Sequence, residues 1–209
     1  GEPACFRFDR EGAHIEIADA PTLNPASFTW MLWFSQAAEN RGAQRPLLLK
    51  SAPAHVAPWY QYGLFALDIA EHPGAVSAVV NVGGSLLSAE AVNVLPEEGW
   101  LHLAAAYDGI SLRLYVNGVQ KAETVGPGGA PEAYPTPLLL GAYGNLPKTD
   151  AYCFRGGMGP VALYGRALSA AAILAAYDAE KGTYPVGSAA DPFEGDAYAA
   201  RLNEALRQP

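Results

Sequence analysis

The stretch WLHLAAAYDGISLRLYVNGVQKAE, residues 100–123, contains runs of alternating side chains separated by short turn signals. The pairs Asp108-Gly109 and Asn117-Gly118 supply residues that tolerate positive φ between such runs. Val116 and Val119 flank the second pair directly, which predicts a two-residue turn. The stretch therefore predicts consecutive antiparallel strands joined by hairpins.

The same alternation extends toward the N-terminus. Residues 6–17 read as a strand, a turn at Glu11 and Gly12, and a second strand. FTWMLWFS, residues 28–35, is apolar on both alternations, which is typical of a central strand with both faces covered. Further strands are predicted at 47–50, 62–69, 76–82 and 137–144.

Toward the C-terminus, YCFRGGMGPVALYGRALSAAAILAAY, residues 152–177, leads from an apolar strand into a short helix. Ser169 can cap a helix over 170–180, and Gly182 is placed to end it. From Thr183 onward the pattern dissolves into a linker, followed by a short amphipathic helix at 196–208 with Tyr198, Leu202 and Leu206 on one side. We therefore divide the chain into one domain, 1–182, and a linker with a short helix, 183–209.

Composition excludes several classes of protein. Half of the 209 residues are apolar, and 22 Gly and 17 Pro indicate many turns. A net charge of −8 with only 13 Lys and Arg argues against nucleic acid and against an anionic membrane surface as partners. No run approaches the roughly 18 apolar residues of a membrane span. A single all-β domain with a tail is expected.

Seven segments together resemble one family, the laminin-G-like, concanavalin A-like jelly rolls that occur as modules of large secreted bacterial proteins. In chain order over residues 4–178 they are CFRFD with IEIADAPTLN, FTWMLWFS, LLLKSA, YGLFAL, GWLHLAAAYDGISLRLYVNG, PLLLGAYG and FRGGMGPVALYGRALSAAAI. The resemblance implies an all-β, two-sheet antiparallel jelly-roll sandwich with a short helix after the last strand and a C-terminal helical tail.

The resemblance also bears on the two cysteines. In that fold the first and last strands are neighbours in one sheet, which would place Cys5 close to Cys153. A disulfide there is predicted to stabilise the domain by about 4 to 5 kcal/mol and to indicate a secreted, periplasmic or cell-surface setting. The alternative is two buried free thiols.

Catalytic residues are not expected. Relatives that are glucanases use paired carboxylates on one strand face, but Glu16 and Asp19 fall on opposite faces. No Gly-x-Ser-x-Gly motif occurs. His102 alternates with Leu101 and Leu103 and is interpreted as a structural histidine.

A cofactor is not expected either. Many relatives bind calcium at one rim, which needs several converging oxygens. Gly157-Met158-Gly159-Pro160 stands where relatives often carry an acidic pair, which leaves Asp9, Asp108 and Asp150 only as isolated calcium ligands. We expect no metal, with calcium as the alternative.

Aromatic residues in two loops are the candidate ligand-binding residues. Trp33 and Trp100 are interpreted as internal, and Trp30 as lining either the core or the concave surface, but Trp59 lies in a Pro-containing connection. Sugar rings bind flat aromatic platforms beside polar groups. If both loops reach one rim, they form a binding cleft; otherwise these aromatics only cover the ends of the sandwich. The candidates are Trp59, Tyr60 and Tyr62 from the first loop and Tyr143, Asn145, Asp150, Tyr152 and Arg155 from the second.

The sequence therefore predicts a module that acts by binding and is not an enzyme. The first hypothesis is a carbohydrate-binding module that recognises a polysaccharide or other glycan within a larger secreted protein. The alternative is a structural or protein-interaction module whose C-terminal helix connects to an adjacent domain.

Overall fold

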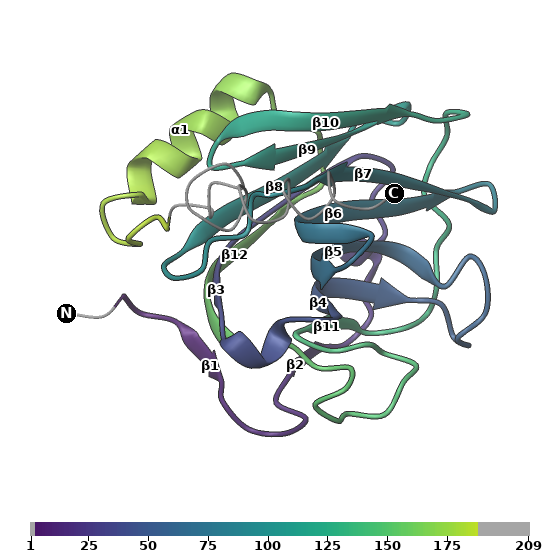
Figure 1. Ribbon diagram of the computed structural model, residues 1–209. Helices are drawn as coiled ribbons and strands as arrows, with labels where there is room; N and C mark the ends of the chain where they lie inside the picture. Colours follow the sequence, from purple (N-terminus) through teal and green to yellow (C-terminus); the bar gives the residue numbers. More distant parts are fainter. Residues whose placement is uncertain (1–2, 188–209) are drawn as a thin grey trace, which may run out of the picture.

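Two antiparallel sheets of six strands each pack face to face in the computed structural model, which describes residues 3–187 (Figure 1). In spatial order, the first sheet contains β1 (Phe6–Phe8), β12 (Gly156–Tyr164), β3 (Phe28–Gln36), β8 (Leu101–Tyr107), β9 (Ser111–Val116) and β10 (Val119–Val125). The second contains β2 (Ile15–Ile17), β11 (Leu138–Leu140), β4 (Gln44–Ser51), β5 (Tyr60–Ile69), β6 (His72–Val82) and β7 (Ser85–Ala91). Short 3₁₀ turns, η1 (Pro21–Leu23) and η2 (Ala38–Asn40), and the helix α1 (Ala170–Glu180) complete the fold. The predicted jelly-roll sandwich is confirmed.

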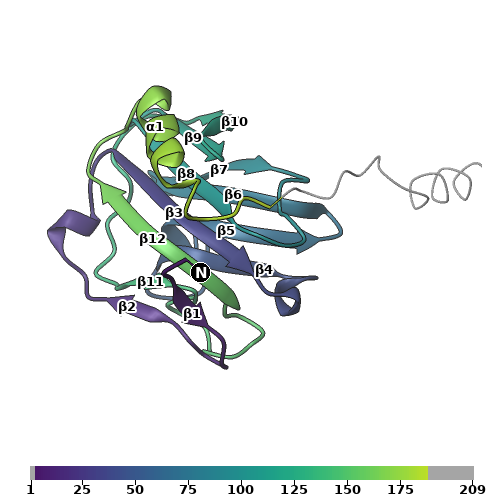
Figure 2. The same ribbon diagram turned by 90° about the vertical axis from the view of Figure 1, so that its left-hand side faces the viewer.

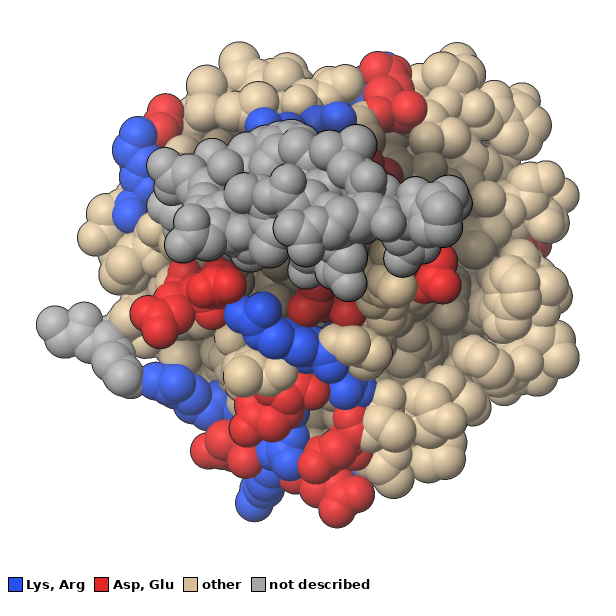
Figure 3. Space-filling model, viewed as in Figure 1, with Lys and Arg blue, Asp and Glu red and all other residues tan. Residues whose placement is uncertain are grey.

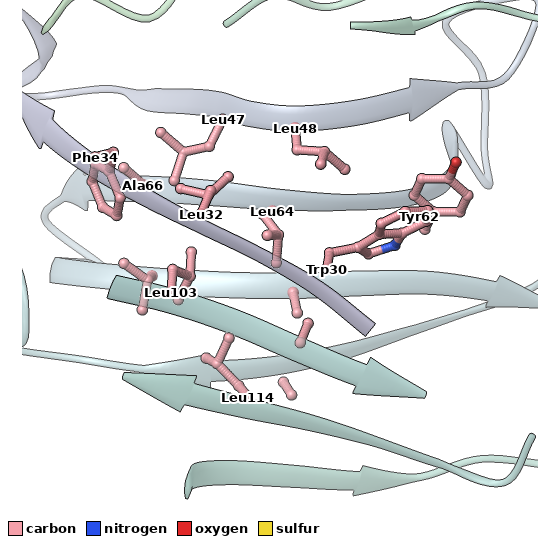
Figure 4. Packing of buried hydrophobic residues seen from close by; sticks show 14 of the residues in the cluster. Trp30, Leu32, Phe34, Leu47, Leu48, Tyr62, Leu64, Ala66, Leu103 and Leu114 are labelled. Atoms are coloured by element: carbon pink, nitrogen blue, oxygen red, sulfur yellow. The ribbon is translucent and has the colours of Figure 1, made fainter. Parts of the chain in front are cut away.

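The core lies between the two sheets. Trp30, Leu32 and Phe34 alternate inward from β3 and meet the inner residues of β4 and β5 (Figure 4). The ring of Trp30 lies 4.7 Å from that of Tyr62. Of the two alternatives left open for Trp30, the structure shows the core.

The opposite face of the first sheet is also covered, by α1 and the residues that follow it (Figure 2). Ile173 of α1 packs on this face, and Ser169 caps the helix by accepting a hydrogen bond from the Ala172 N–H at 3.2 Å. Trp33 is fully buried here, and its Nε1 donates to Glu180 Oε2 at 2.7 Å. The central strand β3 thus has both faces covered, as its sequence predicts.

The chain stays packed against the sandwich beyond the predicted boundary at residue 182. The Tyr184 hydroxyl donates to the Ala4 carbonyl at 2.9 Å, and the Trp100 N–H donates to the Pro185 carbonyl at 2.8 Å. Trp100 is buried against Trp33 and Tyr184. Both tryptophans are therefore internal, as predicted, but they lie on the face of the first sheet that points away from the second sheet and is covered by α1 and the residues after it. The helix predicted at 196–208, with Tyr198, Leu202 and Leu206, lies outside the described residues.

The predicted disulfide is wrong, although its premise is right. Strands β1 and β12 do pair, but Phe6 lies opposite Met158, which puts Cys5 level with Gly159. Cys153 comes before β12 and pairs instead with Ala142 beside the second sheet. Both cysteines are free, so the disulfide no longer supports an extracellular setting.

The predicted two-residue turn is confirmed between β9 and β10. Val116 lies opposite Val119, and Asn117 and Gly118 both have positive φ, 49° and 78°. Gly118 also lies directly beneath α1, because a Cβ there would be 2.8 Å from Leu174 Cδ1 and 3.2 Å from Leu174 Cα. Gly118 is therefore required both by the positive φ of the turn and by the close approach of α1.

We expect Gly118→Ala to lower the free energy of unfolding by about 2 kcal/mol or more, from the left-handed backbone and the contact with α1. Gly83→Ala is the matched control, since Gly83 has φ 57° with no atom within 4 Å of the added Cβ. It should cost only the backbone part, about 1 kcal/mol. Urea denaturation of both variants measures the difference, and equal losses would show that α1 does not press on the turn.

Candidate binding site

Two loops far apart in the sequence meet at one rim of the second sheet. They are the β4–β5 loop, residues 52–59, and the segment between β11 and β12, residues 141–155. Asn145 Nδ2 donates to the Ala52 carbonyl at 3.0 Å, and the Gly144 N–H donates to Ser51 Oγ at 3.0 Å. Asn145 Oδ1 also lies 3.3 Å from His55 Nδ1. The condition set by the sequence, that both loops reach the same rim, is met.

Aromatic rings from the two loops form a connected group. The Tyr143 ring lies 6.3 Å from those of Tyr60 and His55 and 6.4 Å from that of Tyr152. Trp59 and Tyr152 are 40% and 39% exposed, whereas Tyr143 is buried. We call these four rings, together with the exposed Trp59 that precedes Tyr60 in the chain, the aromatic ledge; it consists of His55, Trp59, Tyr60, Tyr143 and Tyr152.

Trp59 has an unusual backbone conformation. Its φ is 62°, a region that bulky residues rarely adopt and that costs energy. The Ala52 N–H donates to the Trp59 carbonyl and the Trp59 N–H to the Val56 carbonyl, both at 2.8 Å. These hydrogen bonds hold an exposed tryptophan in one backbone conformation, an arrangement that clusters at ligand-binding positions.

The ledge rests on an apolar outer face of the second sheet. Tyr143 packs with a buried cluster of Leu49, Phe65, Leu67, Ala75 and Val79. Burial raises the pKa of the Tyr60 and Tyr143 hydroxyls. These hydroxyls therefore stay neutral near pH 7 and keep both donor and acceptor capacity.

Asp150 and Arg155 lie at the end of the same segment. Arg155 Nε and Nη2 donate to Asp150 Oδ1 and Oδ2 at 3.1 and 2.9 Å, and this pairing raises the pKa of the guanidinium. The Arg155 backbone is fixed by Asn40, whose Oδ1 accepts from the Arg155 N–H at 2.9 Å. The pair borders a hollow of about 340 Å³, lined by Arg7, Phe8, Asp9, Ala37, Glu39, Asp150, Arg155 and Gly156.

Tyr62 is not part of the site. It is fully buried in the core, and its hydroxyl donates to the Leu23 carbonyl at 2.9 Å. Simple alternation puts Tyr60 and Tyr62 on the same face, but the pairing of β4 with β5 shifts by one residue between Lys50 and Ser51. The bulge turns Tyr60 outward while Tyr62 stays inside.

Two cations that sequence analysis missed hold the second loop in place. Arg45, which is only 7% exposed, donates from Nη1 to the Asp150 carbonyl at 2.6 Å and from Nη2 to the Glu39 carbonyl at 3.3 Å. Lys148 Nζ donates to the carbonyls of Tyr143 and Leu146. Arg45 carried a usable signal, because a charged residue inside a buried strand is rarely without partners.

The isolated carboxylates named for calcium have other partners or stand apart. Asp108 accepts hydrogen bonds from the N–H groups of Ile110 and Ser111 and from Arg113, and these lower its pKa to about 2. Asp150 pairs with Arg155, and Asp9 lies at the border of the hollow. Across residues 3–187, no three His, Cys, Asp or Glu side chains gather closely enough to hold a metal ion.

A twelve-stranded sandwich with an aromatic rim places the protein in the class of concanavalin A-like β-sandwiches. A family model for the concanavalin A-like lectin/glucanases superfamily matches residues 9–174. The chain belongs to this superfamily. A search of curated protein sequences found no match.

Several solved structures are similar in fold. The carbohydrate-binding module CBM40 of the Ruminococcus gnavus IT-sialidase is 17% identical, with a TM-score of 0.66 over 83% of this chain and 96% of that one. The same module bound to α2,3-sialyllactose gives a TM-score of 0.64 at 17% identity, over the same shares of the two chains. The ligand-binding domain of botulinum neurotoxin serotype D in complex with N-acetylneuraminic acid is 13% identical, with a TM-score of 0.61 over 84% of this chain and 42% of that chain. Within the part of the chain that the structure describes, no helix is long and apolar enough to span a membrane.

Proposed function

We propose that this protein is a non-catalytic carbohydrate-binding module that holds a glycan against the aromatic ledge. The observation that carries the proposal is the pair of exposed side chains Trp59 and Tyr152, presented by two loops that hydrogen bonds tie together. Exposed aromatic faces beside polar groups stack on the apolar faces of sugar rings. Preorganised loops also reduce the entropy lost on binding.

The similar structures support a glycan as the ligand, because one of them is a carbohydrate-binding module and two contain sialyllactose or N-acetylneuraminic acid. This support concerns the class of ligand, a glycan, and does not extend to a particular sugar. We further propose that the module belongs to a larger secreted protein, beside adjacent domains, and that it binds without a metal ion.

We expect Trp59→Ala and Tyr152→Ala each to weaken glycan binding about tenfold or more, because each removes an exposed ring of the platform. The measurement is an affinity screen of the purified protein against a glycan array and a panel of soluble polysaccharides. The panel includes lactose and its sialylated derivatives.

Tyr164→Ala is the matched control. Tyr164 is 38% exposed, close to the value for Tyr152, but it lies at the end of β12 away from the ledge. It should leave binding unchanged, and so should EDTA. If wild type binds no glycan, the proposal fails and the structural or protein-interaction module becomes the better reading.

A further inference from the structure

Few cations lie near the aromatic ledge. The β4–β5 loop, residues 52–59, contains no Lys or Arg, and the segment 141–155 contains only Lys148 and Arg155. Arg45 lies behind them on β4. A sugar carboxylate that reached the ledge would recruit one of these three groups, or Arg7, which lines the hollow beside Arg155.

Each of the three cations is already bonded within the chain. Arg155 is held by both oxygens of Asp150, Lys148 donates to two backbone carbonyls, and the buried Arg45 donates to two more. Turning Lys148 or Arg45 toward a ligand anion would leave a carbonyl without its donor, which carries the cost of an unmade hydrogen bond. Arg155 keeps N–H groups outside its pair, but an anion that reached them would lie beside the Asp150 carboxylate. The loop geometry therefore opposes recruitment.

The charge around the segment 141–155 also opposes the binding of an anionic sugar. The Asp150 side chain is 56% exposed, against 18% for that of Arg155, so the negative partner of the pair is the one that meets solvent. In Figure 3, basic and acidic side chains gather on the left and lower part of the face and in a smaller group at the top, and the right-hand part is almost wholly uncharged. With a net charge of −8, the protein repels anions at long range.

We propose that the aromatic ledge selects uncharged sugars and discriminates against sugars with a carboxylate, and that the Asp150–Arg155 pair determines this specificity. The inference rests on the proposed function. The Tyr152 N–H donates to the Thr149 carbonyl at 2.9 Å, so one turn holds Asp150 beside Tyr152. A hydroxyl can donate to the Asp150 carboxylate and accept from the remaining Arg155 N–H groups without breaking the pair.

The test compares glycans that differ only in the acidic group. One pair is the carboxyl methyl ester of 3′-sialyllactose and 3′-sialyllactose itself, and the other is methyl-esterified and de-esterified polygalacturonate. We expect the uncharged member of a pair to bind about tenfold more tightly at low salt, with the gap narrowing at about 0.5 M salt because screening weakens the repulsion.

Asp150→Asn frees Arg155 and should improve the affinity for the acidic member relative to the uncharged one by about fivefold to tenfold. Asp178→Asn is the matched control, since it removes a surface carboxylate that pairs with Lys181 at 2.6 Å on the C-terminal turn of α1. It makes the same change in net charge and should leave the ratio unchanged. The wild-type salt dependence provides a readout that does not depend on how either variant folds.

The outcomes separate the two levels of the proposal. Tighter binding of the acidic members would overturn the inference while the proposed function stands. An equal shift of the ratio in both variants would assign the specificity to net charge and overturn the role of the Asp150–Arg155 pair. Absence of binding to every glycan would remove the proposed function, and this inference with it.

Discussion

Lys50→Met lowers the free energy of unfolding by about 3 to 5 kcal/mol, the range found when one partner of a buried ion pair is removed. Lys50 Nζ is fully buried and donates to Asp19 Oδ1 at 2.6 Å, the Tyr134 carbonyl at 2.7 Å and the Thr136 carbonyl at 2.5 Å. An ammonium has three donors and no acceptor, so these oxygens satisfy it completely. Methionine fills a similar volume but donates to none of them.

The size of the effect follows from what remains after the substitution. Asp19 keeps partial access to water, since its side chain is 32% exposed, and it still accepts from Asn24 Nδ2 at 3.2 Å. The carbonyls of Tyr134 and Thr136 lose a charged donor, and a buried unsatisfied acceptor costs about 1 to 3 kcal/mol. The segment that joins β10 to β11 also loses its contact with Lys50, although Thr136 Oγ1 still donates to the Ser51 carbonyl of β4 at 2.7 Å.

Lys181→Met is the control, because it removes an ion pair that is about half exposed on both sides, 51% for Lys181 and 47% for Asp178. Exposed pairs contribute about 1 kcal/mol or less. Urea denaturation at neutral pH measures both variants. A loss for Lys50→Met as small as that for Lys181→Met would mean that water reaches the oxygens around Lys50.

Most strands could be predicted from the sequence because one face of each carries the core. Alternation marked β8 and β9, apolar runs marked β3, β5 and β6, and the turn residues Asn117 and Gly118 fixed one hairpin. Strand β7 was not predicted. Its inward residues are Leu87, Ala89 and Ala91, and alanine gives only a weak β signal.

The errors arose where position depends on register. The pairing of β1 with β12 was correctly anticipated, but Cys5 lies level with Gly159, whereas Cys153 comes before β12 and lies beside the second sheet. Tyr62 was assigned to the surface with Tyr60 because no local signal marks the bulge that divides them. Register is set by pairing with distant strands, which the sequence of one segment does not contain.

In the candidate site, too, individual residues could be predicted from the sequence but their long-range contacts could not. The exposed ring of Trp59 and that of Tyr152 were named from loop composition alone, but the contacts that bring their loops together join residues far apart in the chain. Asn145 binds Ala52, and Arg45 binds Asp150, across 93 and 105 residues. The aromatic residues of these loops could be recognised from the sequence, but the hydrogen bonds that hold the loops together could be recognised only from the tertiary structure.

The second large effect concerns pH and His102. Its side chain is buried on the outer face of the first sheet, with ring centroids 5.1 Å from Trp33 and 5.8 Å from Tyr177. Among the described residues, His102 Nδ1 has no hydrogen-bond partner. Burial lowers its pKa to about 4, so the folded protein holds it neutral. Glu180 of α1 lines the same hollow as His102, and its carboxylate accepts a hydrogen bond from Trp33 Nε1.

The sign follows from proton uptake by the unfolded chain. An unfolded histidine has a pKa of about 6.5, so below that pH the unfolded state binds a proton that the folded state refuses. The contribution of His102 is fully present above pH 6.5 and is lost as pH falls toward the folded value of about 4. The loss amounts to about 3 kcal/mol, since each pH unit of displacement is worth about 1.4 kcal/mol.

We therefore expect the free energy of unfolding of wild type, measured in urea from pH 7 to 4.5, to fall more steeply than that of His102→Phe. Phenylalanine keeps an aromatic ring beside Trp33 and cannot bind a proton, so the difference between the two curves isolates His102. His14→Phe is the control, because His14 is exposed on the loop before β2 and its removal should leave the slope unchanged. Parallel curves for wild type and His102→Phe would mean that His102 accepts its proton without unfolding, through an opening of α1 that lets water reach Nδ1.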